Sequence, residues 1–378
     1  MPYRPKKKVL HVITGLDDGG AEGVLAGLCL HAKEASHVVV SLRNDGKYGS
    51  ILKAANIPVY SLGLSPSKPN PMKLFALVKL IRKESPDVVQ TWMYHSDLLG
   101  GIAAKLAGVE AIFWGVRHSV LEKGKSKRST IMIAKLCAWL SSFIPTKIIC
   151  CAEKALQVHS DIGYRKSKLV VVKNGYDLSR FKPSDELRIT TRSQFGASNE
   201  VSLLGMVGRY DPLKDHINLL RSLDFLEDKS NVKCMLVGKG LSQDNAELVQ
   251  VIDELDLKNI VILAGQQTNI SAIMNALDVH VLSSSSEGFP NVLTEAMACG
   301  TPCVTTDTGD AAIIVKDTGW VIPAQNSQLL SNAISSALNE KTSKPMRWKE
   351  RKAQCRNRVE ENFSIDMMVA GYMAAWNI

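Results

Sequence analysis

Short runs of β-branched and other apolar residues alternate with longer stretches of helical periodicity along this chain. Such alternation is typical of repeated βαβ units, in which each short run forms a buried strand of a parallel sheet. The pattern therefore predicts an α/β protein with two sets of strands. The first set comprises residues 9–13, 38–42, 88–91, 112–116, 148–151 and 170–172, and the second comprises residues 203–207, 232–237, 260–263, 279–282, 302–305 and 320–322.

A polar stretch, residues 182–200, separates the two sets and is predicted to be a connection between domains. The length of 378 residues also exceeds the usual size of one hydrophobic core, so two domains are expected. We predict an N-terminal domain over residues 1–180 and a C-terminal domain over residues 200–360. A last segment, residues 361–378, carries a final helical pattern.

The most informative segment follows the predicted strand 279–282. Glu287 stands in a Gly/Pro turn there, and Glu295 stands on the helix that follows. The loop after a buried parallel strand lies at the ligand-binding end of a doubly wound sheet, and the next helix presents unpaired backbone N–H groups to an anion. Glu295 is then placed to accept hydrogen bonds from ribose hydroxyls, and Glu287 from a second polyhydroxylated group. A nucleotide-activated sugar would satisfy both carboxylates, and the expected donor site includes the residues between them, Gly288, Phe289, Pro290, Asn291, Val292 and Leu293.

A simpler interpretation of the same residues also exists. Glu287 would be a solvated loop charge, and Glu295 would be a first-turn residue favoured by the helix dipole.

Residues 283–307 resemble the signature of the family 4 glycosyltransferases, retaining enzymes of the GT-B fold that transfer a sugar from a nucleoside diphosphate donor. Residues 15–22 are similar to the glycine loop of that family, residues 174–181 to the segment before its hinge, and residues 207–214 to its phosphate-clamping motif. The resemblance covers most of the chain. It implies two Rossmann-like doubly wound domains that face each other across a cleft, with the last helix crossing back onto the first domain.

Arg209 and Lys214 are the predicted phosphate-binding cations. A departing nucleoside diphosphate gains negative charge as the bond to the sugar breaks, so fixed cations stabilise the transition state more than the ground state. Arg209 follows an apolar strand, where its planar guanidinium can bind phosphate oxygens in two places, and Lys214 adds a point charge. The alternative is a pair of surface basic residues. Because no Asp-X-Asp motif is present in the sequence, we expect catalysis without a metal ion or other cofactor.

The glycine loop of the first half has its glycines at positions 15, 19 and 20, not in the G-x-G-x-x-G spacing of nicotinamide-binding folds. A dehydrogenase is therefore disfavoured. Gly19 and Gly20 can bring backbone amides close to a phosphate or to the sugar, as the resemblance implies, although a tight turn without a ligand is the alternative. By resemblance, His118 stands where many family members contact the donor sugar. His95, at the start of a predicted helix, is a weaker candidate for the same wall.

Composition and charge narrow the cellular setting. The eight cysteines show no metal-ligand spacing and most lie in apolar runs, which favours a reduced, cytoplasmic location. The net charge of +9 suggests attraction to an anionic surface. Basic residues precede the apolar stretch 131–144, which is a poor bilayer-spanning segment and favours peripheral contact with an anionic membrane, although a core helix is an equal alternative. A basic stripe with interleaved aromatic residues, or a zinc-finger spacing, would indicate binding of nucleic acid, and the sequence contains neither.

These features together predict a glycosyltransferase on the inner face of the plasma membrane. It would move a hexose or N-acetylhexosamine from a nucleoside diphosphate sugar to a lipid-linked glycan of a surface polysaccharide or lipopolysaccharide. A UDP-linked donor is expected, with a GDP-linked donor as the alternative, and the resemblance implies retention. A sugar-nucleotide epimerase on the same fold and a non-catalytic nucleotide- or nucleic-acid-binding protein are the alternatives.

Overall fold

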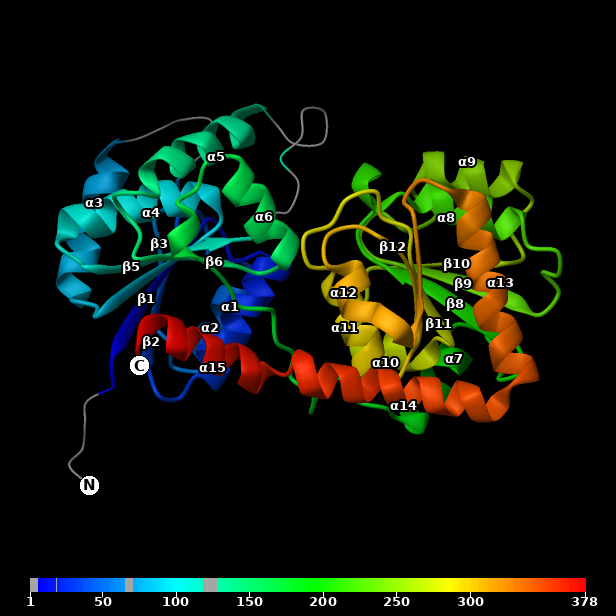
Figure 1. Cartoon of the computed structure of the whole chain (residues 1–378). Helices are drawn as coiled ribbons and strands as arrows, with labels where there is room; N and C mark the ends of the chain where they lie inside the picture. Colours follow the sequence, from blue (N-terminus) through cyan, green and yellow to red (C-terminus); the bar gives the residue numbers. More distant parts are fainter. Residues whose placement is uncertain (1–5, 18, 65–70, 118–120, 122–127) are drawn as a thin grey trace, which may run out of the picture. The chain divides into compact units, whose positions relative to one another are not determined.

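The computed structural model describes residues 6–17, 19–64, 71–117, 121 and 128–378, and it divides the chain into two compact units. Unit 1 contains the chain up to Gly175 together with Ile365–Ile378, and unit 2 contains Tyr176–Ser364. Each unit is built on one parallel β-sheet with helices on both faces (Figure 1).

Unit 1 has a seven-stranded sheet in the order β3-β2-β1-β4-β5-β6-β7. Its strands are β1 (Lys8–Ile13), β2 (Ser36–Ser41), β3 (Val59–Ser61), β4 (Val88–Trp92), β5 (Ala111–Val116), β6 (Lys147–Cys150) and β7 (Leu169–Val171). Its helices are α1 (Gly20–His31), α2 (Gly46–Ala54), α3 (Pro71–Glu84), α4 (Tyr94–Ala107), α5 (Arg128–Leu140), α6 (Glu153–Asp161), the 3-10 turn η1 (Lys166–Lys168) and α15 (Ile365–Trp376). Helices α3, α4 and α5 pack side by side, while α1 packs against α2 and α15 on the other face of the sheet (Figure 1).

Unit 2 has a six-stranded sheet in the order β10-β9-β8-β11-β12-β13. Its strands are β8 (Ser202–Val207), β9 (Val232–Val237), β10 (Val261–Gly265), β11 (Val279–Leu282), β12 (Cys303–Thr306) and β13 (Trp320–Ile322). Its helices are α7 (Asp185–Gln194), α8 (His216–Asp224), α9 (Ala246–Glu254), α10 (Ile270–Ala276), α11 (Asn291–Ala298), α12 (Ala311–Val315), α13 (Ser327–Ser343) and α14 (Pro345–Asn362), with 3-10 turns η2 (Pro212–Lys214) and η3 (Lys316–Thr318).

The strand prediction agrees with both sheets except at one edge, where β3 was not expected. The central strands are buried on both faces because helices cover both sides of each sheet: every residue of β8, β11 and β12 is buried. The final helical pattern is also confirmed, since α15 supplies Ile365, Tyr372 and Trp376 to the core of unit 1 beside α1.

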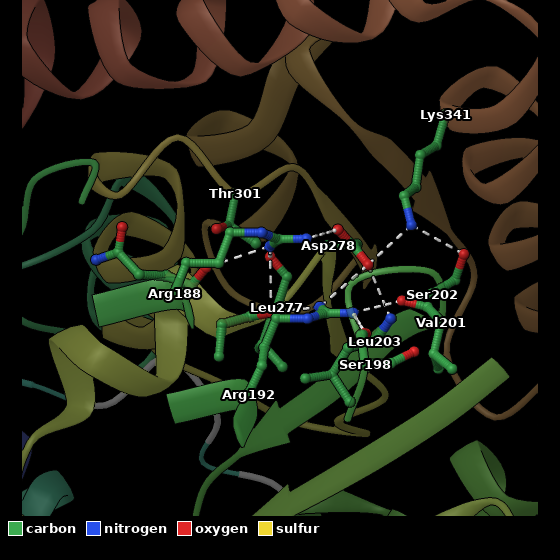
Figure 2. A network of polar contacts seen from close by, with 12 residues as sticks. Arg188, Arg192, Ser198, Val201, Ser202, Leu203, Leu277, Asp278, Thr301 and Lys341 are labelled. Carbon is green, nitrogen blue, oxygen red and sulfur yellow. Dashed lines mark hydrogen bonds and ion pairs between the residues drawn. The ribbon is translucent and has the colours of Figure 1, made fainter. Parts of the chain in front are cut away.

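The stretch predicted as a connection contains a helix instead, so that prediction was wrong. Helix α7 begins after Ser184, whose hydroxyl accepts a hydrogen bond from the N–H of Leu187, and it packs on α10. A polar network attaches α7 to the sheet (Figure 2). Arg188 and Arg192 bind the carboxylate of Asp278 at 2.6 and 3.4 Å.

The same carboxylate receives a third cation, Lys341 of α13, at 2.9 Å (Figure 2). Burial by itself raises the pKa of Asp278, but Arg188, Lys341 and the backbone N–H of Leu203 outweigh it and hold that pKa below its usual value. Asp278 therefore stays ionised, and it connects α7, α13 and the start of β8 at the end of the sheet opposite the loops that follow β8 and β11.

Candidate functional site

The order of strands in unit 2 reverses between β8 and β11, and ligands of doubly wound sheets bind beyond the carboxyl ends of such strands. The loops that follow these two strands are tied together. The hydroxyl of Ser283 donates to the carbonyl oxygens of Lys214 and Asp215 at 3.1 and 2.8 Å, and the N–H of Ser285 donates to Leu213 O at 2.9 Å. The loop after β8 and the Glu287 loop therefore form one surface.

Lys214 and Glu287 meet on this surface. Lys214 Nζ lies 2.6 Å from Glu287 Oε1, and both side chains are largely buried. The hydroxyl of Ser284 donates to the same carboxylate oxygen at 2.6 Å. Ser284 is fully buried and is in turn fixed by Thr306, whose hydroxyl donates to its carbonyl oxygen at 2.6 Å. The sequence analysis did not single out Ser284, although a hydroxyl three positions before Glu287 in a run of serines was the available signal.

Arg209 lies on the same loop as Lys214 but has a different partner. Its guanidinium approaches Asp211 at 3.0 Å, and its side chain is 69% exposed. Asp211 is itself held in place, because its other carboxylate oxygen accepts the N–H of Leu213 at 2.9 Å. Arg209 is therefore oriented by a fixed carboxylate while it faces solvent, where an anionic ligand can reach it.

Close backbone packing shapes the turn between Glu287 and α11. A Cβ at Gly309, whose φ is +57°, would lie 2.1 Å from the carbonyl oxygen of Gly288, so only glycine allows the β12 loop to approach. Asp310 N–H donates to that same oxygen at 3.0 Å. Pro290 then precedes the first helical residue, Asn291, and no acidic side chain lies in the first turn of α11. The positive end of this helix is thus available to an anion.

The predicted donor residues on this segment divide into two kinds. The side chains of Phe289, Pro290 and Leu293 are buried, and Phe289 packs edge-on against Phe363, so these residues would act through their backbone. Gly288, Asn291 and Val292 are partly exposed, and Asn291 Oδ1 accepts a hydrogen bond from Tyr176.

Glu295 lies one turn into α11 and is partly buried. Burial raises the pKa of its carboxyl to about 7, against the opposing influence of Arg180. This carboxyl therefore changes its charge near neutral pH, which is unusual for a glutamate and is frequent at functional sites.

The loops after β8 and β9 also pack closely. A Cβ at Gly238 would lie 2.1 Å from Gly208 O, and Tyr210 N–H donates to Lys239 O at 2.8 Å. The ring of Tyr210 contacts His216 at 5.5 Å between centroids. These contacts fix the backbone from which Arg209 projects.

In unit 1, Gly19 precedes α1 and Gly20 is its first residue. A Cβ at Gly19 would lie 2.3 Å from a carboxylate oxygen of Glu22, so the absence of a side chain lets Glu22 fold back onto the helix start. His95 is an exposed residue in the first turn of α4. The third candidate of this unit, His118, lies outside the described residues.

Within the described residues, His11, Cys29 and His37 are buried and close enough to hold a metal ion. Their hydrogen bonds indicate another role. Trp92 Nε1 donates to His11 Nδ1 at 3.2 Å, so His11 carries its proton on Nε2 and donates to His37 Nδ1 at 3.0 Å. His37 Nε2 then donates to Ala32 O at 3.0 Å. In this histidine relay every ring nitrogen is used, and burial lowers the pKa of both histidines, which keeps them neutral.

Comparisons with known proteins agree with this architecture. Residues 188–354 match the family model "Glycosyl transferases group 1", and residues 18–180 match "Glycosyltransferase Family 4". A UDP-Gal:α-D-GlcNAc-diphosphoundecaprenol α-1,3-galactosyltransferase of Escherichia coli is 26% identical over 77% of this chain and 75% of its own length. EpsF of Bacillus subtilis, a glycosyltransferase by name, is 24% identical over 80% of the chain and 79% of its own length. The crystal structure of Anabaena HepE in complex with UDP-glucose has a TM-score of 0.85 at 22% identity, covering 98% of this chain and 99% of that one.

Two parallel-sheet, Rossmann-like units and this structural likeness define a GT-B protein. With one family model on each half, the chain belongs to the family 4 glycosyltransferases. Among the described residues, no helix combines the length and the apolarity of a bilayer-spanning segment.

Proposed function

We propose that the protein transfers a hexose or N-acetylhexosamine from a UDP-sugar to a hydroxyl of a lipid-linked glycan, with retention and without a metal ion. The reaction would take place at the inner face of the plasma membrane during synthesis of a surface polysaccharide or lipopolysaccharide. The name of the Escherichia coli relative supports the class of donor and acceptor, because it specifies a UDP-sugar and a diphosphoundecaprenol-linked GlcNAc.

The 2.6 Å contact between Lys214 Nζ and Glu287 Oε1 carries the proposal. In a nucleoside diphosphate sugar, one oxygen atom joins the sugar to the terminal phosphate. A carboxylate that accepts from sugar hydroxyls and an ammonium that binds this phosphate can therefore lie next to each other. Unrelated surface charges would not need this spacing, nor the buried hydroxyl of Ser284 that fixes the carboxylate.

The protein's part in the reaction would be electrostatic. Lys214, Arg209 and the first N–H groups of α11 stabilise the charge that grows on the departing diphosphate. The acceptor hydroxyl loses its proton to a phosphate oxygen of the leaving group, as the family resemblance implies, so no side chain has to act as the general base. Glu287 would orient the sugar, and Glu295 would bind the ribose.

Transfer of radiolabelled sugar tests the proposal. Purified protein is given a panel of UDP- and GDP-sugars with extracts of undecaprenol-linked glycans, and an incubation without acceptor distinguishes a transferase from an epimerase. Product formation should persist in EDTA, and NMR of the new linkage should show the anomeric configuration of the donor. Loss of activity in EDTA with recovery on addition of magnesium or manganese would contradict metal independence.

The Arg209→Ala variant gives the residue-level test. It should lower kcat by about a hundredfold or more while the midpoint of thermal unfolding stays unchanged, because one cation is removed from the transition state and the side chain is largely exposed. Arg221→Ala, an exposed arginine of α8, is the matched control and should keep full activity. A stable Arg209→Ala variant with normal kcat would refute the phosphate-binding role.

A further inference from the structure

One face of α5 in unit 1 carries an exposed apolar stripe. Met132, Leu136, Trp139 and Phe143 are 69%, 44%, 66% and 65% exposed. They follow one another at intervals of four, three and four residues, which places them on one side of the helix and its C-terminal extension. Trp139 and Phe143 contact each other, with 5.8 Å between ring centroids. The stripe is defined by these four residues.

The opposite side of α5 accounts for the packing of this helix. Ala134, Cys137 and Ala138 are buried, and Cys137 lies against α4, where its thiol contacts Tyr94 O at 3.7 Å. The core of unit 1 therefore does not need the stripe. Large apolar side chains grouped on the solvent face of a helix are a feature of interaction surfaces.

The segment that carries the stripe has charges of one sign. From Arg128 to Ala152 the sequence contains basic residues but no aspartate or glutamate. Arg128 and Lys135 are exposed on α5 itself. Lys168 reaches the other end of the stripe, where its Nζ donates to Ser142 O and Pro145 O at 2.9 and 2.7 Å, on either side of Phe143.

Further cations lie close to Lys168. Burial, Arg165 and Lys105 together lower the pKa of Lys168. Like charges so close to each other are unfavourable in the protein alone and become favourable beside an anionic partner. A protein partner would have to be both apolar and acidic, whereas an anionic bilayer supplies an apolar interior beneath a negative surface.

We propose that the α5 stripe inserts into the surface of an anionic lipid bilayer, with Lys135, Lys168 and their basic neighbours contacting the headgroups. The geometry is that of an interfacial helix, whose aromatic and aliphatic side chains enter the boundary between headgroups and acyl chains while the lysines bind lipid phosphates. The inference deepens the proposed function, on which it rests for the presence of a lipid-linked acceptor, by assigning the surface that holds unit 1 at the membrane.

Flotation of the full-length chain with vesicles tests the assignment. The protein should float with vesicles that contain phosphatidylglycerol, and flotation should weaken with pure phosphatidylcholine and at high salt. The double variant Met132→Ser/Phe143→Ser should lower partitioning by about tenfold or more, because two inserted side chains are lost. Lys135→Glu should weaken binding to the anionic vesicles only.

Unit 2 offers a matched control. Met346 and Phe225 are 72% and 50% exposed, so Met346→Ser/Phe225→Ser removes the same residue types from another surface and should float as the unchanged protein does. Thermal unfolding of each variant verifies folding. Equal flotation of the stripe variant and the unchanged protein would overturn the proposal. The proposal would also be overturned if the protein did not float with vesicles but formed dimers, and the stripe variant did not form them. The partner of the stripe would then be a second copy of the chain.

A separate assay distinguishes failure of this inference from failure of the proposed function. Binding of UDP-sugars by calorimetry, measured without vesicles, should be the same for the stripe variant and the unchanged protein, because the stripe lies in unit 1 and the Lys214–Glu287 pair in unit 2. A protein that floats with anionic vesicles but binds no nucleotide sugar would support the membrane-binding role of the stripe and contradict the proposed transferase function.

Discussion

The titration of Glu295 should make donor binding depend on pH in a defined direction. Its carboxyl has a pKa of about 7 because burial disfavours the charged form. In the proposed donor complex, the ionised carboxylate would accept hydrogen bonds from both ribose hydroxyls, whereas the protonated acid has one fewer acceptor site and carries no charge. Affinity for a UDP-sugar should therefore rise as the pH rises through 7.

The size of this effect follows from the pKa. About nine-tenths of the carboxyl is ionised at pH 8 and about one-tenth at pH 6, so the association constant should fall by about tenfold between them. That ratio corresponds to about 1.4 kcal/mol of binding free energy. Binding at pH 7 should also release about half a proton per donor molecule, because about half of the free protein carries the proton at its pKa.

Isothermal titration calorimetry measures both quantities. A UDP-sugar is used instead of UDP, because a terminal phosphate titrates near pH 6 and would obscure the protein's proton. Titrations in buffers of different ionisation enthalpy give the number of protons released. The Glu295→Gln variant should bind more weakly at pH 8, with no proton release and no dependence on pH. Equal affinity of the unchanged protein at pH 6 and pH 8, or a slope that survives in Glu295→Gln, would refute this role for Glu295.

Three other substitutions test separate parts of the structure. Ser284→Ala should lower kcat/KM by about tenfold, because Glu287 loses one of its orienting hydrogen bonds, whereas Ser286→Ala should not. Asp278→Asn should lower the free energy of unfolding in urea by about 3–5 kcal/mol, because the buried guanidinium beside it loses its counterion. The histidine relay should destabilise the protein in acid: its pKa values are lowered on folding, so its contribution is full above about pH 6.5 and is lost as the pH falls below that value. His37→Gln should reduce this slope in urea titrations between pH 7.5 and 5.5, and an unchanged slope would assign it to other groups.

Most of the fold could be predicted from the sequence because buried parallel strands are apolar on both faces and stand out from their surroundings. The prediction for β9, β11 and β13 agrees with the structure at both ends. Strand β3 was missed because it is short, lies at the sheet edge and has no buried residue. Its pairing with β2 alone leaves it half solvated, so its sequence lacks the apolar run that marks the other strands.

Helix α7 was missed for a different reason. Its position in the fold depends on arginines, not on an apolar stripe. Arg192 is almost completely buried and donates to Ala276 O at 2.8 Å in addition to its contact with Asp278. An arginine in a polar stretch is usually exposed, and only the burial of Asp278, which directly precedes β11, explains why Arg192 is buried. Sequence periodicity carries no such information, because the partner lies far away along the chain.

The candidate site also has one feature that the sequence predicts and one that it does not. Its location beyond β8 and β11 was predictable, because the strand pattern and the segment 287–295 both point to one edge of the sheet. The contact between Lys214 and Glu287 was not predictable, since it depends on the hydrogen bonds from Ser283 and Ser285 to the facing loop.

The contact between Lys214 and Glu287 also has a consequence for the proposed function. An ammonium has three N–H donors and Glu287 uses one of them, so Lys214 can bind a phosphate oxygen without leaving the carboxylate. The contact with Glu287 holds Lys214 in place, so binding of the proposed donor would not have to order this side chain.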